Sequence, residues 1–563
     1  MANGMGSLYI GASGLQNSQN ALNTTANNLA NADTKGYVRQ QVLFADRDYV
    51  TFKGAAISKQ QAGLGLAIAD VIHTRDYFLD KYYRTENGRQ SFYETNYLAV
   101  QDVENMFQEL EGQQFQQTLE DFWNSFEELK KGPELEIYQN LVVQKATLFI
   151  ERAQGIYKNM KDYQSRINIK VKKSVDRINE LGHTIQDLNK QIMKIESGGV
   201  ETAMTLRDER DNALDELSSL AKVEFREDGN GAVHVRLENV SFLDEVHVFE
   251  IGTIEDDITG FITPVWPHLS TAGSGTYTPV FDFGVDIAPE LASDIGELKA
   301  LVLSRGDTVA NYRDVTGLSA DQYNDGAGMS VMLSAEAEFD QYIHEIITAI
   351  NDILSPTVTT SFTGADGTEY KNVRVWDENA CVSKDGEKPG RELFVRRGWD
   401  RYTEVAGNDG KIYYVYNEED SPDTEKMYTI QNVTVNPDLL EIECGLPLLN
   451  QNGEPDMEAA KRLAGIWKEK KYTVNPNDTN KCDFKEYYQR MIDGIGTKGN
   501  VFKGMAEDLE GEVAAIENNR QQVFGVSSDE ELQNMIKYQS AYNASSRFIN
   551  VINEMLEHLV TRL

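Results

Sequence analysis

One stretch of the sequence begins like the zinc-binding helix of a metalloprotease. His344 and Glu345 stand in the order that such a helix needs, but Thr348 occupies the position of the second histidine. Two histidines one helical turn apart are required to hold the ion. The stretch therefore predicts an ordinary helix without zinc.

The other groups that could bind a metal ion are dispersed along the chain. His234 and His247 lie in alternating, strand-like sequence. Two strand histidines could share a metal ion, but ordinary surface or core roles are the stronger interpretation. The turn at 228–231 and the acidic run at 255–257 lack the 1, 3, 5, 12 ligand spacing of a calcium loop. We expect no metal site and no cofactor.

The three cysteines are Cys381, Cys444 and Cys482. They are too few and too scattered for a disulfide framework, and their spacing fits no zinc motif. One disulfide and three free thiols both remain open, and the scatter favours free thiols.

Charged residues are dense between Leu206 and Asn212. On a helix, such charges pair with one another three and four residues apart, which predicts a salt-bridged face rather than an active site. The sequence also contains no phosphate-binding loop, no nucleophile elbow and no Cys–His pair. We therefore expect no enzymatic activity.

The composition excludes two classes of partner. The 563 residues carry a formal charge of −36, from 90 acidic and 54 basic side chains. Nucleic acid and anionic membranes require clustered Lys and Arg, so neither is expected as a partner. No apolar run approaches the ~20 residues that cross a bilayer. The N-terminus lacks the basic start and apolar core of a signal peptide, so we expect export by another route.

Both ends of the chain carry leucine-rich heptads. Leu8, Leu15, Leu22 and Leu29 recur every seven residues, in a segment, 1–32, without any charged side chain. Early glycines weaken this helix by ~1 kcal/mol each, so it should form only against a partner. The C-terminal heptads consist of Met535, Tyr542, Ile549, Leu556 and Leu563, with Tyr538, Ile552 and Leu559 in the second seam. The two ends are therefore predicted to pair as a coiled coil.

The middle of the chain alternates between helical and strand-like sequence. Val171, Ile178, Ile185 and Ile192 form a third heptad run, and the turn at 228–231 predicts a hairpin. We predict an α+β multidomain fold, in which a terminal coiled coil and a long helical bundle carry two inserted, mainly β domains. The expected divisions are 1–45 with 528–563 for the coiled coil; 46–222, 290–355 and 484–527 for the bundle; and 223–289 and 356–483 for the β domains.

The N-terminal segment resembles a known pattern. The matching runs are Ala21-Leu22-Asn23, Asn27-Asn28-Leu29-Ala30-Asn31 and Thr34-Lys35-Gly36-Tyr37-Val38-Arg39. They are similar to the N-terminal signature of the flagellar rod, hook and hook-associated axial proteins. In that pattern the leucines form a seam, the asparagines can hydrogen-bond to neighbouring subunits, and Gly36 lets the chain turn sharply out of the helix.

The C-terminal segment resembles the closing signature of the same group. The matching runs are Gly525-Val526-Ser527, Asp529-Glu530-Glu531-Leu532, Tyr538-Gln539, Ala541-Tyr542 and Glu554-Met555-Leu556. The Asp-Glu-Glu form, the chain length and the helical sequence at 207–217 are similar to the hook-associated proteins of the hook–filament junction. The hook protein itself is the alternative, and an added adhesin or binding role of the β domains is another.

The resemblance implies a structural role and a set of partners. A ring of about eleven copies would stand between hook protein on one side and hook-associated protein 3 on the other. A cytoplasmic chaperone would mask the C-terminal helix before type III export to the extracellular flagellum. The residues implied in assembly are Leu8, Leu15, Leu22, Asn27, Asn28, Leu29, Asn31, Thr34, Gly36 and Tyr37 at the N-terminus, and Leu532, Met535, Tyr538, Tyr542, Ile549, Ile552, Leu556, Leu559 and Leu563 at the C-terminus.

Overall fold

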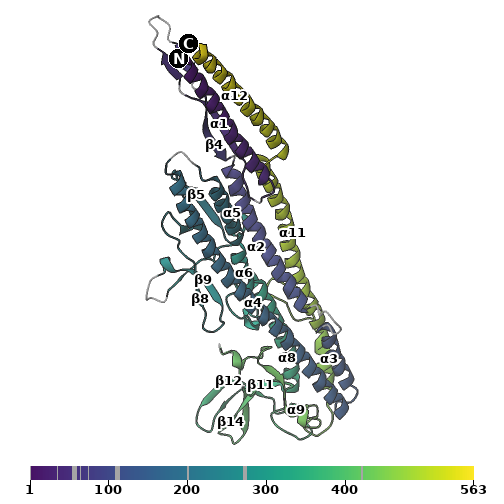
Figure 1. The fold of residues 1–563 in the computed structure, drawn as a ribbon. Helices are drawn as coiled ribbons and strands as arrows, with labels where there is room; N and C mark the ends of the chain where they lie inside the picture. The colour runs from purple at the N-terminus through teal and green to yellow at the C-terminus, as the bar shows by residue number, and fades with distance from the viewer. Residues whose placement is uncertain are drawn as a thin grey trace.

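The structure is a computed structural model of an elongated molecule whose two termini lie together at one end (Figure 1). It describes residues 2–34, 36–47, 49–52, 60–63, 65–73, 75–107, 115–198, 202–270, 276–419 and 423–562. Long helices carry two groups of small antiparallel sheets, and the second group lies at the end opposite the termini. The fold is the predicted α+β multidomain class.

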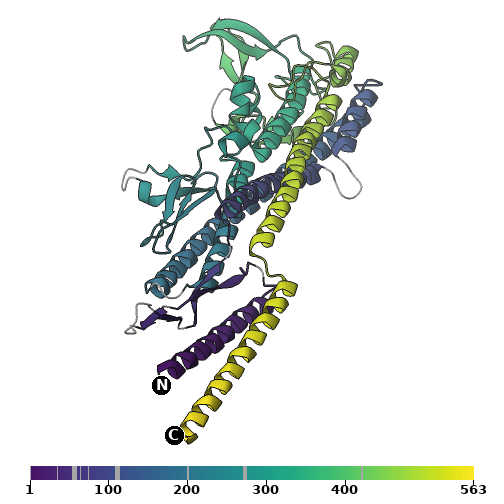
Figure 2. The same cartoon turned by 90° about the horizontal axis from the view of Figure 1, so that it is seen from above.

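The chain ends form an antiparallel pair of helices, α1 (Ala2–Ala30) and α12 (Ser528–Arg562), which we call the terminal arms (Figures 1 and 2). A strand ribbon packs against α1. It consists of β1 (Gln40–Asp46) with β4 (Leu66–His73), and of β2 (Tyr49–Phe52) with β3 (Gln60–Gly63). The side chain of Asn17 on α1 donates to the carbonyl of Leu66 at 2.5 Å, which ties ribbon to helix.

The ribbon corrects one sequence prediction. Residues 46–222 were expected to belong to the helical domain, but helix resumes only at α2, which begins at Tyr77. The signal was present in the Tyr-Val-Thr-Phe run of β2, because aromatic and β-branched residues favour strands.

The body is a bundle of long helices. It comprises α2 (Tyr77–Phe107), α3 (Phe115–Leu129), α4 (Glu136–Glu196), α5 (Met204–Leu220), α6 (Glu297–Arg305), α7 (Ala320–Asn324), α8 (Val331–Leu354) and α11 (Phe484–Phe524). The predicted heptad run lies on α4, where Val171, Ile178 and Ile185 are fully buried. Helix α11 packs along α2, and α4 packs against α3, α5 and α6.

The first β module consists of two three-stranded sheets. They are β5 (Val223–Glu227), β6 (Val233–Leu237) and β7 (Val240–Leu243), and then β8 (Gly252–Glu255), β9 (Ile262–Trp266) and β10 (Thr278–Pro279). The predicted hairpin at 228–231 joins β5 to β6 and is confirmed. Three asparagines of α4 each bind backbone N–H and C=O groups of this module: Asn168 at Ile262 and Gly260, Asn179 at Ile251, and Asn189 at Val233. The module is therefore bound along α4.

The second β module contains a four-stranded sheet in the order β11 (Thr357–Thr363), β12 (Glu369–Trp376), β15 (Ile412–Tyr416) and β14 (Tyr402–Ala406). A short pair, β13 (Phe394–Arg396) with β16 (Val433–Val435), lies beside it. The later part of 356–483 is not β as expected, because α9 (Asp438–Glu441) and α10 (Met457–Gly465) follow β16. The amphipathic run Met457–Gly465 buries Leu463 fully, which the prediction overlooked.

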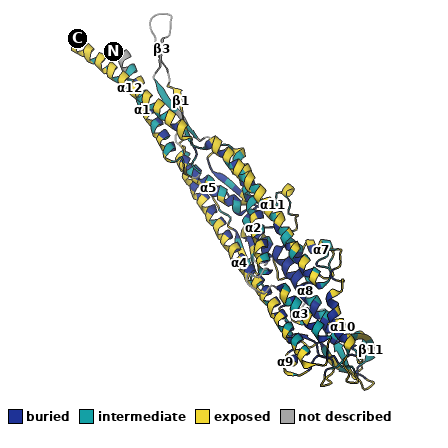
Figure 3. Cartoon of the chain, turned by 90° about the vertical axis from the view of Figure 1, so that its right-hand side faces the viewer, coloured by how far each residue is buried: buried dark blue, intermediate teal, exposed yellow. Residues whose placement is uncertain are grey.

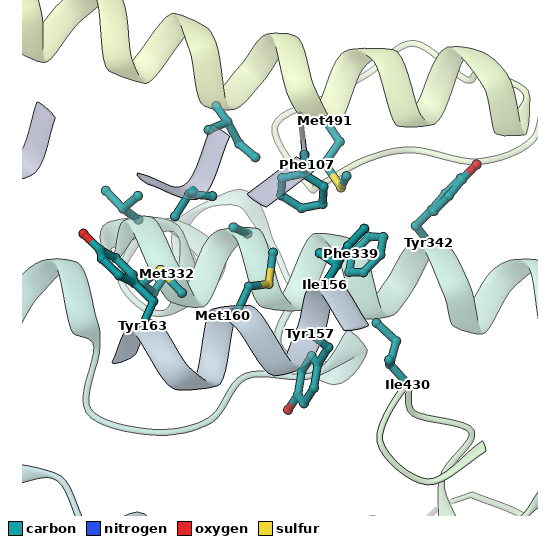
Figure 4. Packing of buried hydrophobic residues seen from close by; sticks show 14 of the residues in the cluster. Phe107, Ile156, Tyr157, Met160, Tyr163, Met332, Phe339, Tyr342, Ile430 and Met491 are labelled. Atoms are coloured by element: carbon teal, nitrogen blue, oxygen red, sulfur yellow. The ribbon is translucent and has the colours of Figure 1, made fainter. Parts of the chain in front are cut away.

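Helix α8 is the centre of the body (Figure 4). Its Phe339 and Tyr342 are fully buried, and Phe339 contacts Phe107 of α2 edge-to-face with ring centroids 5.3 Å apart. Met491 of α11 closes the cluster from the other side. His344, the residue of the incomplete zinc motif, lies on the same helix and stacks on Tyr312 at 3.8 Å. It is an ordinary helix residue.

The cysteines and the remaining metal candidates take structural positions. Cys381 is half-buried, Cys444 and Cys482 are buried, and all three are free. Among the described residues, no group of three His, Cys, Asp or Glu side chains converges as a metal site would require. Within the same ranges, no helix combines the length and the apolar character that a membrane span requires.

Three carboxyl groups of α8 are buried and accept hydrogen bonds from other segments of the body. Glu336 accepts from Gln164 at 3.3 Å, Glu338 from the hydroxyl of Tyr323 at 2.6 Å, and Asp340 from the backbone of Ile430 at 2.7 Å. Burial raises the pKa of Glu336 to about 7 and that of Asp340 to about 6. Burial also raises the pKa of Glu338.

These raised pKa values predict that the body is less stable at alkaline pH. The folded state binds protons that the unfolded state releases between about pH 4.5 and 7, so stability is greatest below this window and is lost as pH rises through it. We expect the free energy of unfolding in urea to fall by on the order of 2 kcal/mol between pH 5 and pH 8. Glu336→Gln should reduce this fall, whereas the exposed control Glu443→Gln should not. An identical pH slope for wild type and Glu336→Gln would contradict the assignment.

Candidate assembly interface at the chain ends

Small side chains line the contact between the terminal arms. On α1, Gly11, Ser18 and Thr25 recur every seven residues and are buried, as is Ala21. A Cβ on Gly11 would lie 2.7 Å from Ile549 of α12, and a Cβ on Gly14 would lie 2.7 Å from the hydroxyl of Ser545. The glycines therefore allow a close approach of the two helices.

The predicted leucine stripe of α1 lies at the edge of this contact. Leu8, Leu15, Leu22 and Leu29 are all half-buried. Beside them Tyr9 is 61% exposed and Ile10 is 40% exposed. Within one chain, the stripe is therefore only partly covered, and small residues occupy the centre of the helix pair.

The predicted residues of α12 divide into two groups. Those facing α1 are half-buried: Met535, Tyr538, Tyr542, Ile549, Ile552 and Leu556. Leu532 and Leu559 are 45% and 57% exposed, and on the outer face Ile536 and Met555 are 65% and 59% exposed. Leu563 lies outside the described residues. Figure 3 shows the contrast, with exposed residues along the arms and buried residues concentrated in the body.

The arms are joined most closely where they meet the body, in a region around Asn28 and Glu531 that we call the root of the arms. The Asn28 amide donates to Glu531 at 3.2 Å and to the carbonyl of Gln40 at 2.9 Å, and its oxygen accepts from the hydroxyl of Tyr37 at 2.9 Å. Arg39 pairs with the same Glu531 at 2.8 Å. Glu531 is the only buried residue of α12 within the described part of the chain.

The other predicted polar residues make local hydrogen bonds. Asn27 donates to the hydroxyl of Tyr37 at 3.3 Å, Asn31 donates to the carbonyl of Asn27 at 2.9 Å, and Thr34 donates to the side chain of Asn31 at 3.3 Å. Gly36 has a φ of +76°, which L side chains rarely adopt. These bonds set the sharp turn from α1 into the linker at 36–39.

A charged network between α2, α5 and α11 supports this root, and the sequence did not reveal it. Arg84 binds Asp211 at 3.1 Å and Asp215 at 2.6 Å, and Arg520 binds Asp215 at 2.8 Å and Asp80 at 2.9 Å. Both arginines are almost fully buried. Each carboxylate is therefore held by a partner from another helix.

This network corrects the prediction for the run 206–212. Arg207 pairs with Glu196 of α4 at 2.7 Å, and Arg210 pairs with Glu227 of β5 at 2.9 Å, rather than with charges three or four residues away. Spacing along one helix cannot distinguish these alternatives, because the partners lie 11 and 17 residues away in sequence. The run thus binds α5 into the body.

Three family descriptions match separate parts of the chain. Residues 100–355 match the flagellar hook-associated protein FlgK helical domain, residues 8–37 match the flagella basal body rod protein, and residues 522–562 match the flagellar basal body rod FlgEFG protein C-terminal region. The first contains α4, α5 and the first β module. The other two contain the terminal arms.

Known proteins resemble the chain over nearly its whole length. Flagellar hook-associated protein 1 of Bacillus subtilis (strain 168) is 27% identical over 549 residues, which is 96% of this chain and 95% of that protein. Flagellar hook protein FlgE of Borreliella burgdorferi is 38% identical over 84 residues, 13% of this chain and 19% of that protein. The structure of the flagellar hook junction protein FlgK from Burkholderia pseudomallei shares the fold, with a TM-score of 0.51 and 11% identity over 79% of this chain and all of the other.

The descriptions that match the arms and the body are all of flagellar proteins. The chain is thus similar over nearly its whole length to flagellar hook-associated protein 1, and it is a structural component of the bacterial flagellum.

Proposed function

We propose that the protein forms the junction between hook and filament, and that it assembles through its terminal arms. The observation that carries this proposal is the partial exposure of two apolar stripes that a single chain leaves open, around Leu15 on α1 and Met555 on α12. Contiguous apolar surface of this kind marks an interaction site. The uncharged segment 1–32 can be buried between copies without desolvating charges, which costs several kcal/mol each.

The proposed assembly is a ring of about eleven copies in which the arms form an inner tube. The body helices form an outer tube around it, and the two β modules project outwards. Hook protein binds one side of the ring and hook-associated protein 3 binds the other. The match of residues 522–562 to the flagellar basal body rod FlgEFG protein C-terminal region supports contact between like arms on the hook side. A chaperone covers α12 before export of the chain to the cell exterior.

Electron microscopy of a strain lacking this chain tests the proposal. We expect hooks without filaments, because the first filament-side subunit has nothing to bind. Loss of the hook itself would instead identify the chain as hook protein and overturn the junction role. Normal filaments on normal hooks would also contradict the proposal.

The arms are proposed to be disordered in the free monomer and to fold on docking. Their contact buries small residues such as Gly11 and Ser18, which contribute little hydrophobic stabilisation. Isolated helices with early glycines are unstable in water. Ordering only at the growing end would prevent premature polymerisation.

Hydrogen exchange of the dilute full-length chain measures this disorder. We expect peptides from α1 and α12 to exchange within seconds, while peptides from α4 remain protected by the buried core. Assembly into flagella should then slow exchange in both arms. Protection of both arms in the dilute monomer would show that they fold without docking.

A further inference from the structure

The arms are joined to the body through a narrow part of the chain (Figure 2). Helix α1 packs against α12, β1 and β4 rather than against the long body helices. The linker at 36–39 leads from α1 back to the body, where Val38 is fully buried. The backbone N–H of Arg39 donates to the carbonyl of Phe524, the last residue of α11, at 2.8 Å. The segment that follows α1 and the segment that precedes α12 therefore meet at Arg39 and Phe524.

The linker is bound to one face of α5. The N–H of Val38 donates to the carboxylate of Asp208 at 3.2 Å. One helical turn later, Asn212 lies so close to Gly36 that a Cβ there would be 1.9 Å from its side-chain oxygen. Residues four apart on a helix share a face, so Asp208 and Asn212 form a single seat for the linker.

Other side chains of α5 fix the helix to the body. Arg207, Arg210 and Asp211 bind α4, β5 and α2 through the ion pairs described above. Asp208 is itself 4% exposed. The seat therefore keeps a constant position relative to the body core.

The linker in turn holds α12. Arg39 binds Glu531 and Glu530 at 2.8 Å each, and both carboxylates lie in the first turn of α12. The side-chain amide of Asn28 on α1 donates a hydrogen bond to the same Glu531. A displacement of the linker is therefore transmitted to both arms together.

A cavity of about 730 Å³ lies beside the linker, where the arms join the body. Its walls include Gly36 of the linker, Asn212 of α5, and Arg520 and Phe524 of α11. Side chains do not fill this space, so the linker has room to move if its bond to α5 is lost.

We infer that Asp208 is a positioning residue: through its hydrogen bond to the Val38 N–H, it fixes the direction in which the paired terminal arms leave the body. The inference rests on the proposed function, because arm direction matters only if the arms are the elements of assembly. The contact area of the arms with neighbouring subunits depends on that direction, and Asp208 controls it without touching a neighbour.

The charges around Asp208 give the contact a dependence on pH. Burial raises the pKa of Asp208 to about 7, against the lowering effects of the Val38 N–H and of Arg75. Asp211 and Glu209 on the same helix raise it further, and the Tyr37 hydroxyl also faces it. Protonation removes the charge that strengthens the bond to Val38, so the joint loosens as pH falls below about 7.

Pulsed electron spin distance measurement on assembled flagella tests this inference. Spin labels are placed at Ser540→Cys on α12 and Lys173→Cys on α4, both exposed, in the full-length chain diluted with unlabelled chain. Incorporation of the labelled wild-type chain is scored first and reports on the proposed function alone. At pH 8 we expect a narrow distance distribution for wild type and one about twofold broader for Asp208→Ala, because one charge-assisted hydrogen bond is lost.

Two further variants and one control make the result specific. Wild type should broaden between pH 8 and pH 6. Asp208→Asn keeps an acceptor for Val38 but carries no charge, as the protonated carboxyl group does, so its distribution should match that of wild type at pH 6 and should not respond to pH. Gly36→Ala breaks the same seat from the linker side and should match Asp208→Ala. At pH 8, where Asp208 is charged in both proteins, the exposed neighbour Glu209→Ala should match wild type.

Loss of Asp208→Ala from flagella that incorporate Asp208→Asn would also support a positioning role. The inference is overturned if Asp208→Ala and Gly36→Ala give distributions as narrow as wild type. It is equally overturned if Asp208→Asn broadens with falling pH as wild type does.

Discussion

Leu15→Lys should abolish incorporation of the protein into flagella while leaving the body folded. Leu15 lies on the half-buried stripe of α1, where the first 32 residues carry no charge. In the proposed assembly every copy would have to desolvate this lysine against a neighbour, at a cost of several kcal/mol. A cost of that size weakens each docking step about 10³-fold. We expect cells that express only this variant to carry hooks without filaments.

The control for this prediction is Leu148→Lys. Leu148 is 52% exposed on α4 and lies on the body, far in sequence from both arms. The same chemical change should leave filaments intact at this position. Both variants should unfold at the wild-type temperature. Normal filaments with Leu15→Lys would show that this face of α1 meets no neighbour.

Arg520→Ala should destabilise the body by about 3–5 kcal/mol, the range observed when one member of a buried ion pair is removed. Arg520 is 3% exposed, and it binds Asp80 and Asp215. Both carboxylates would lose a partner in a buried site, and α11 would lose its main polar link to α2 and α5. Urea denaturation of the full-length chain, followed by far-ultraviolet circular dichroism, measures the change.

A matched substitution on the same helix separates the network from helix propensity. Lys503 is exposed on α11, and Lys503→Ala should change stability by less than about 0.5 kcal/mol. If Arg520→Ala were no more destabilising than Lys503→Ala, the buried network would contribute nothing to holding α11 in place.

Heptad spacing predicted the helices well because a helix that packs on one side repeats its apolar residues regularly. Val171, Ile178 and Ile185 follow that rule, and all three lie in the core along α4. The turn at 228–231 was predictable for a similar reason, since its glycines and polar residues act locally. Features that depend only on residues close together in sequence could therefore be predicted.

Contacts between segments that are far apart in sequence could not be predicted in this way. Arg84 meets Asp215 across 131 residues, and Asn28 meets Glu531 across 503. Neither pair has a spacing that distinguishes it from other Arg–Asp or Asn–Glu pairs. The sequence also placed the leucines at the centre of the arm contact. The centre is formed by Gly11, Ser18 and Thr25, because small residues let two backbones approach closely.

The central claim is that the two arms together are necessary for docking. Purified chain can be added to hooks isolated from a strain that lacks it, which bypasses export. A version restricted to residues 31–527, with its helical body verified by circular dichroism, is compared with the full-length chain by immunogold labelling. The account predicts one labelled band at the hook end with the full-length chain and none with the armless chain. A band formed by the armless chain would contradict it.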